Sequence, residues 1–139
     1  MDDRLLFMLS KATHKLTNYL KIQFIEAGVH MSPGQMGILM LLRQKDLRPM
    51  NELGKILDID NSAITRLVDR LEKSGLVLRQ ANPKDRRQYL IGMTDKGLQQ
   101  TLKAKKISKA ANDKIRDGFT DNEIEVFKRM MVSFKEKFG

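Results

Sequence analysis

The chain has 139 residues, of which 41% are hydrophobic and 31% charged, and its formal net charge is +9. This length fits one domain, or a domain with an oligomerisation arm, and no apolar run approaches the ~18 residues of a membrane span. There is no cysteine, which excludes disulfide scaffolding, a thiol nucleophile and thiol-based redox sensing. We find no signal-peptide pattern at the N-terminus and expect a cytoplasmic protein without a membrane partner.

The positive charge is unevenly distributed. Residues 61–87 carry seven basic and three acidic side chains, residues 88–120 carry the same excess, and the remaining segments are close to neutral. A solvated basic face and a polyanion-binding face are both compatible with such an excess.

The first predicted element is a long helix over residues 3–27, ended by Gly28. Its apolar residues recur at near-heptad spacing: Leu5, Leu9, Ala12, Leu16 and Tyr19. This is more apolar surface than a lone terminal helix should show, so we expect it to pack on another helix or another subunit.

Two further helices are predicted before residue 60. Ser32 and Gln35 form a capping box around Pro33, and the helix that follows is apolar almost all round, which indicates a central position. Pro49 marks the boundary of a short helix, residues 50–57. The spacing of small and apolar residues across the next turn is typical of a helix-turn-helix: Leu53, Gly54, Leu57, Ile59, Ile64 and Leu67. Asp58 departs from this pattern, because many such turns have glycine there.

The second helix of this motif should begin near Asn61, with Asp60, Asn61 or Ser62 as its cap, and end at Gly75. One face is apolar and comprises Ile64, Leu67, Val68 and Leu71. The opposite face is polar and comprises Ser62, Thr65, Arg66, Asp69 and Arg70.

A β-hairpin is predicted next. Residues 76–79 are β-prone, Asn82-Pro83 is a turn signal, and residues 89–93 alternate along a return strand. The segment Lys84-Asp85-Arg86-Arg87 forms a basic tip. A polar helix followed by a basic hairpin is the plan of a winged helix-turn-helix, so the expected fold class is mainly α with a small β-hairpin wing.

Two helices are predicted at the C-terminal end. Thr94 can cap a helix that runs to about Asp117 with a lysine-rich outer face, and Thr120 with Glu123 forms a capping box for the last one. An apolar seam then repeats every three or four residues: Ile124, Phe127, Met131, Phe134 and Phe138. Apolar seams at both ends of the chain favour dimerisation, and the alternative is that both pack within one subunit.

With these elements in place, the chain resembles the MarR family of bacterial transcription regulators. The residues that carry the resemblance are 32–39, 61–75 and, above all, Asp85-Arg-Arg-Gln-Tyr-Leu-Ile-Gly-Met-Thr-Asp-Lys-Gly97. The resemblance covers essentially the whole chain. It implies one domain over residues 1–139, with a DNA-binding lobe at 32–96 and dimerisation helices at 1–28 and 97–139.

The resemblance further implies a homodimer that binds a palindromic operator in double-stranded DNA, with repression the commoner outcome. The residues expected to contact DNA are Asn61, Ser62, Thr65, Arg66, Arg70, Lys84, Arg86 and Arg87, and Asp85 is expected to orient an arginine rather than to touch DNA. Arg66 has the fork geometry for guanine, and the family's wing places Arg87 in the minor groove. The residues expected at the dimer interface are Leu5, Leu9, Leu16, Ile124, Phe127, Met131 and Phe134.

Other functions are less well supported by the sequence. We expect no enzyme, cofactor or metal, since no catalytic motif or metal-ligand spacing is present and the only histidines are His14 and His30. A small aromatic or lipophilic effector is implied by the family, but no residue identifies its pocket. The main alternative is a winged-helix module that binds protein, and a basic amphipathic helix at 95–117 that binds membrane is a weaker one.

Overall fold

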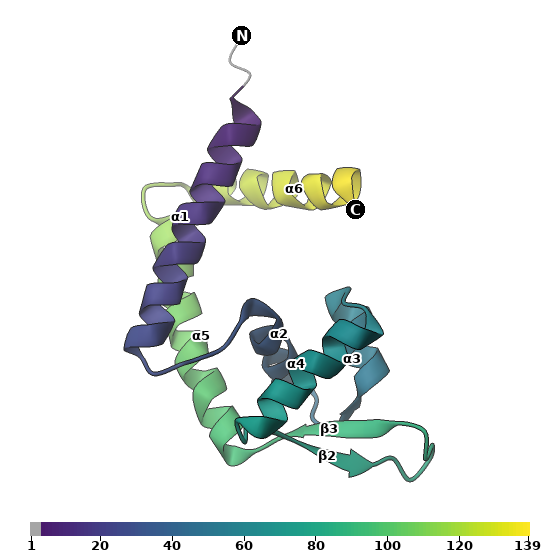
Figure 1. The fold of residues 1–139 in the computed structure, drawn as a ribbon. Helices are drawn as coiled ribbons and strands as arrows, with labels where there is room; N and C mark the ends of the chain where they lie inside the picture. The colour runs from purple at the N-terminus through teal and green to yellow at the C-terminus, as the bar shows by residue number, and fades with distance from the viewer. Residues whose placement is uncertain (1–3) are drawn as a thin grey trace. The chain divides into compact units, whose positions relative to one another are not determined.

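The computed structural model describes residues 4–139 of the chain. Its contacts divide the chain into two compact units, Met1–Ile107 and Ser108–Gly139. The elements in chain order are α1 (Leu5–Glu26), α2 (Pro33–Gln44), β1 (Arg48–Pro49), α3 (Met50–Leu57), α4 (Asn61–Lys73), β2 (Val77–Ala81), β3 (Tyr89–Met93), α5 (Asp95–Arg116) and α6 (Asp121–Phe138) (Figure 1). Every predicted helix and the predicted hairpin are therefore confirmed, and only the first residue of the predicted 3–27 helix lies outside the described part.

The sheet of the first unit has three strands rather than two. The strand order is β1-β3-β2, both pairings are antiparallel, and Arg48 of β1 lies opposite Ile91 of β3. The hairpin of β2 and β3 extends away from helices α2, α3 and α4 (Figure 1). Strand β1 was not predicted, because two residues are too few to show a strand periodicity.

The predicted helix caps are present. Ser32 Oγ accepts a hydrogen bond from the Gln35 backbone N–H at 3.2 Å, and the Gln35 side chain accepts one from the Ser32 N–H at 2.8 Å. Thr120 and Glu123 make the same reciprocal pair at 3.2 and 3.0 Å. These bonds satisfy donors that a helix start would otherwise leave unpaired, and they fix where α2 and α6 begin.

The core of the first unit holds helix α4 in place. Its buried residues come from α2, α3, α4 and the sheet: Ile38, Leu39, Leu42, Leu53, Ile64, Val68, Leu71, Leu76, Val77 and Ile91. Three of the four residues of the predicted inner stripe of α4, Ile64, Val68 and Leu71, are at most 1% exposed, and the fourth, Leu67, is half-buried. The polar side of α4 must therefore face away from this core.

One buried charge connects α2 to α3. Arg48 is 8% exposed, and its Nε donates to the Leu41 and Lys45 carbonyls at 3.1 and 3.0 Å. Its Nη1 donates to Glu52 Oε1 at 2.9 Å. The side chain thus satisfies carbonyls at the end of α2 while pairing with a carboxylate on α3.

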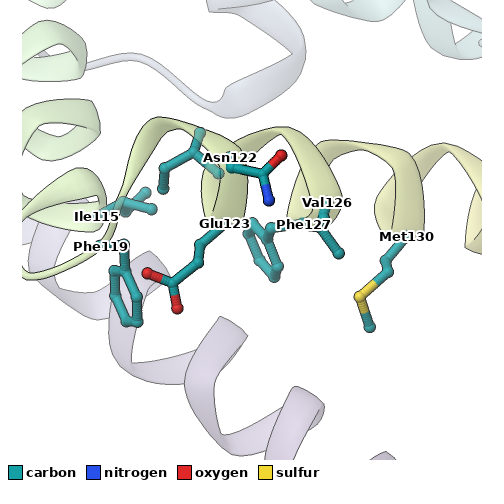
Figure 2. Close-up of a pocket in the computed structure, with 8 residues that line it drawn as sticks. Ile115, Phe119, Asn122, Glu123, Val126, Phe127 and Met130 are labelled. Atoms are coloured by element: carbon teal, nitrogen blue, oxygen red, sulfur yellow. The ribbon is translucent and has the colours of Figure 1, made fainter.

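The second unit contains the end of α5 and helix α6. Between them lies an apolar groove of about 440 Å³, lined by Ile115, Phe119, Asn122, Glu123, Ile124, Val126, Phe127 and Met130 (Figure 2). Of these lining residues Ile124 is only 7% exposed, whereas Phe119 is 61% exposed. Among residues 4–139, no helix is both long and apolar enough to cross a lipid bilayer.

Candidate nucleic-acid interface

The start of α4 is capped by Asp60. Its Oδ1 accepts hydrogen bonds from the Ala63 backbone N–H and from the Ser62 hydroxyl, each at 2.8 Å. The backbone bond from Ala63, followed by the bond from Ser62, lowers the pKa of the Asp60 carboxyl, and the nearby charge of Arg66 contributes less. Of the three predicted cap candidates, Asp60 is therefore the N-cap of α4. Its carboxylate lies at the positive end of the helix dipole.

The two hydroxyls of the polar face are engaged inside the protein. The Ser62 hydroxyl donates to the Asp60 carboxylate, and the Thr65 hydroxyl donates to the Asn61 carbonyl at 2.8 Å. Both side chains are exposed, as is Asn61. In the free protein they present acceptor lone pairs to solvent rather than hydrogen-bond donors.

The cations of the polar face are unpaired. Arg66, Arg70 and Lys73 are exposed, and none of them makes a salt bridge within residues 4–139. Asp69, the residue before Arg70 on the same face, pairs with Arg79 on β2 instead of with a cation of α4.

The wing, defined as β2, β3 and the tip at residues 82–88, is ordered by two side chains. Asn82 Oδ1 accepts from the Lys84 N–H at 3.0 Å, and Asp85 Oδ1 accepts from the Arg87 N–H at 3.0 Å. Asp85 thus holds the main chain of Arg87 and not its guanidinium. The side chains of Lys84, Arg86 and Arg87 are exposed and, in the described part of the chain, without a salt bridge.

The junction of the wing and α5 depends on Thr94 and Gly97, the first and last residues of the segment Thr94-Asp-Lys-Gly97. The Thr94 hydroxyl accepts from the Gly97 N–H at 3.0 Å and donates to the Gly75 carbonyl at 2.6 Å. A Cβ on Gly97 would lie 2.1 Å from the Leu76 carbonyl oxygen, so no other residue fits without a backbone shift. Gly75 itself has φ +74°, which ends α4. The start of α5 therefore rests directly on the turn after α4.

The residues predicted at a dimer interface differ in their exposure within one chain. Leu5 is 79% exposed, and Leu9, Leu16, Phe127 and Met131 are also exposed. Phe134 is half-buried, and Ile124 is buried inside the second unit. Most of this set is thus exposed apolar side chain within one chain, on α1 in the first unit and on α6 in the second.

Two residues of this region were missed from the sequence. Lys73 is a sixth exposed cation beside the five predicted ones, and its position in the last turn of α4 could have identified it. Arg79 is half-buried on β2 and pairs with Asp69 and Glu72 of α4. All three carboxylates of residues 61–87 are consequently engaged within the protein, while six of the seven cations face solvent. The described residues contain no group of three or more potential metal ligands.

This arrangement of a capped helix, a basic wing and a three-stranded sheet defines a winged helix-turn-helix. The MarR family model matches residues 31–89. The transcriptional regulator MhqR of Bacillus subtilis is 30% identical over 95 residues, which are 68% of this chain and 64% of that protein. The chain belongs to the MarR family of transcriptional regulators.

Solved structures share the fold over nearly the whole chain. The transcriptional repressor CouR, described as bound to a 23-mer DNA duplex, is 25% identical with a TM-score of 0.82 over 94% of this chain and 92% of that one. PcaV of Streptomyces coelicolor, described in complex with its natural ligand, is 22% identical with a TM-score of 0.78 over 95% and 89%, which shows the fold alone. The first curated relatives are matched over only 42%, 64% and 49% of their own length, about half on average.

Proposed function

We propose that this protein regulates transcription by binding a specific sequence in double-stranded DNA. The observation that carries the proposal is the charge distribution on α4 and the wing. Six exposed cations without salt bridges lie on these two elements, and every carboxylate of the same stretch is turned to an internal partner. Unpaired cations on one surface are what phosphate recognition requires.

Helix α4 is the element proposed for the major groove. Its inner stripe packs against the core, so the opposite face is free to meet a base edge. The exposed guanidinium of Arg66 can donate two parallel hydrogen bonds to guanine, and Arg70, one turn further along, is proposed to meet phosphate. Asn61, Ser62 and Thr65 complete the contact surface at the start of the helix.

The wing is the element proposed for the minor groove. Asp85 fixes the backbone of Arg87, so the guanidinium extends from a defined point of the tip. A narrow A·T-rich minor groove has an enhanced negative potential that favours an inserted arginine. Lys84 and Arg86 are proposed to support this contact from the flanking phosphates.

We further propose a homodimer built from residues 1–28 and 97–139, with the DNA-binding lobe at 32–96. The exposed apolar residues of α1 and the groove of the second unit support this, because such surface is normally covered in solution. A two-fold dimer reads a palindrome with half-sites about one helical turn, ~10 bp, apart. CouR is described as a repressor, and we propose repression here as well.

Release by a small aromatic or lipophilic effector belongs to the same proposal. PcaV is described with a natural ligand, and the family resemblance implies this kind of control. The pocket is unassigned. The groove of the second unit has an apolar lining, so a lipophilic compound and a second protomer would compete for it.

The alternative function is a winged-helix module that docks on protein. It predicts an apolar or acidic outer face on α4, whereas the observed face carries Arg66, Arg70 and Lys73. The unpaired cations therefore favour nucleic acid over a protein partner.

The test is selection from a library of random duplexes, followed by titration of the enriched sequence at several salt concentrations. We expect the enriched sequence to be a palindrome. The slope of the logarithm of the binding constant against the logarithm of the salt concentration should decrease in magnitude by about 0.9 for each phosphate-contacting cation removed. Arg66→Ala should relax the preference at one base pair by about 1–3 kcal/mol, while Arg87→Ala should weaken binding on every sequence.

Arg43→Ala is the matched control, since it removes an exposed arginine of α2 that lies outside α4, the wing and the proposed dimerisation segments. It should leave both the base preference and the affinity close to those of the parent protein. Absence of any enriched sequence would reject the proposed function. An Arg66→Ala variant with unchanged affinity and preference would reject the placement of α4.

A further inference from the structure

We infer that Arg79 is a positioning residue that fixes the wing against α4, so that the two DNA-contacting elements act as one rigid surface. The inference rests on the proposed function for its consequence in DNA binding. Its structural part concerns only contacts within the first unit.

The guanidinium of Arg79 reaches two carboxylates of α4. Nη2 donates to Asp69 Oδ1, and Nε lies 3.6 Å from Glu72 Oε2. Nε is shielded from solvent and makes no hydrogen bond within residues 4–139. The Arg79 side chain is 22% exposed, whereas those of Asp69 and Glu72 are 49% and 45% exposed. The guanidinium of Arg79 therefore packs against α4 and forms ion pairs with both carboxylates.

The spacing of the two carboxylates suits arginine specifically. Asp69 and Glu72 are three residues apart on a helix, so their side chains lie side by side. A planar guanidinium can pair with both carboxylates at once through different nitrogens, whereas a lysine ammonium is a point charge on a flexible side chain. Partial burial reduces screening by solvent and salt, so these pairs should outweigh an ordinary surface salt bridge.

Arg79 is also the last residue of β2 whose side chain pairs with the helices of the lobe, and beyond it β2 is held through its pairing with β3. Val77 is 2% exposed and belongs to the core, but Leu78, Gln80 and Ala81 are exposed. Beyond Arg79, β2 presents no buried side chain before the basic tip. Among the side chains of β2, Arg79 thus makes the attachment nearest to the tip, while β3 is held separately by its pairing with β1 as far as Leu90.

Two effects on DNA binding follow. Without Arg79 the tip should move more freely relative to α4, so that Arg87 reaches the minor groove only part of the time. Asp69 and Glu72 would also become unpaired charges on the helix that carries Arg66 and Arg70, and would repel phosphate. Positioning and charge cancellation must therefore be separated by experiment.

The positioning role is tested first without DNA. Since the chain has no cysteine, Pro83→Cys gives one labelling site on the exposed tip. The anisotropy decay of a fluorophore there reports wing motion. We expect lower residual anisotropy with Arg79→Gln, partial recovery with Arg79→Lys, and no change with Gln80→Ala, the exposed neighbour on β2. An Arg79→Gln variant with the parent anisotropy would overturn the inference.

The consequence for DNA is tested by double-mutant cycles on the selected duplex. In the parent protein Arg87→Ala should weaken binding by about ten-fold, and in an Arg79→Gln background by less than about three-fold, since an unfixed wing has less contact to lose. Arg66→Ala should weaken DNA binding by the same factor in both backgrounds. Equal Arg87 costs in the two backgrounds would overturn the inference.

The variant Asp69→Asn/Glu72→Gln/Arg79→Gln removes the uncompensated charges without restoring the attachment. We expect it to stay weaker than the parent protein, and full recovery would mean that Arg79 only cancels charge. If the parent protein binds no duplex while Arg79→Gln still frees the wing, the proposed function fails and the attachment stands.

Discussion

Gly97→Ala should destabilise the protein, although it places a better helix former inside α5. Gly97 is buried in the first turn of this helix, and its own N–H donates to the Thr94 hydroxyl at 3.0 Å. An added Cβ would lie 2.1 Å from the Leu76 oxygen and 2.9 Å from Met93 Cγ. The Leu76 oxygen cannot retreat freely, because it accepts the Thr94 N–H at 3.1 Å.

The magnitude follows from three terms. Replacing glycine by alanine in a helix gains about 1 kcal/mol. Carbon and oxygen normally approach to about 3.3 Å, so the added Cβ would overlap the Leu76 oxygen by more than about 1 Å. Overpacking costs ~1–3 kcal/mol, and an overlap of this size should cost at least the upper value. Displacing the carbonyl would also weaken its bond to Thr94, which is worth about 1 kcal/mol. The net expectation is a loss of about 2–3 kcal/mol, or roughly 6–12 °C in Tm for a chain of this size.

The assay is thermal and urea unfolding at one fixed protein concentration, because dimerisation would make the apparent stability depend on concentration. Gly37→Ala is the matched control. Its Cβ would lie 3.0 Å from Leu57 Cδ2, the end of a flexible side chain that can rotate away. We expect this control within about 0.5–1 kcal/mol of the parent protein, since helix propensity offsets a rotamer shift. A Gly97→Ala protein as stable as the control would refute the reasoning.

Substitutions at three further residues probe local features of the first unit. Asp58 has φ +56°, so Asp58→Ala should lose about 1 kcal/mol in urea unfolding while Asp58→Gly should not. Hydrogen bonds from Ala63 and Ser62 lower the pKa of Asp60 from 3.8, so its contribution is present above that value and is lost as the pH falls through the lower folded-state pKa. Asp60→Asn, an equally good cap, should therefore match the parent protein near neutral pH and lose less stability below about pH 4 in acid titration. Arg48→Met leaves the Lys45 carbonyl and the partly exposed Glu52 carboxylate without this partner, while the Leu41 carbonyl keeps its bond from the Lys45 N–H, and calorimetry should show a loss of about 1–3 kcal/mol.

The sequence predicted those parts of the fold that are encoded by neighbouring residues. The capping boxes at Ser32 and Thr120 and the apolar stripe of α4 depend on spacings of three or four residues, which are legible in a single chain. The left-handed residue at Asp58 could also be located, because the helix-turn-helix spacing marks the position even though glycine is absent. The capping boxes fix where α2 and α6 begin, and Asp58 marks where α3 ends.

Contacts between distant or short segments could not be predicted in this way. Strand β1 has only two residues, so its pairing with β3 depends on the fold that brings them together. The pair of Arg79 and Asp69 joins residues ten apart across the turn that follows α4. From the sequence, Asp69 belonged to the same outer face as Arg66, and only the path of β2 shows that its carboxylate is directed to an arginine of the wing.

The direction of the hydroxyl protons changes the expected chemistry of α4 in a way that no spacing could reveal. A carbonyl and an ionised carboxylate can only accept, so the hydroxyls of Thr65 and Ser62 must be the donors in their bonds to Asn61 and Asp60. In a major groove these hydroxyls could then accept from the amino groups of adenine or cytosine, while the Thr65 methyl group could contact the methyl group of thymine. Donation to guanine and to phosphate falls to the guanidiniums. On the proposed docking, the cations therefore supply most of the affinity, and discrimination among the remaining bases depends on Asn61 and on two hydroxyls that already donate to internal partners before DNA binds.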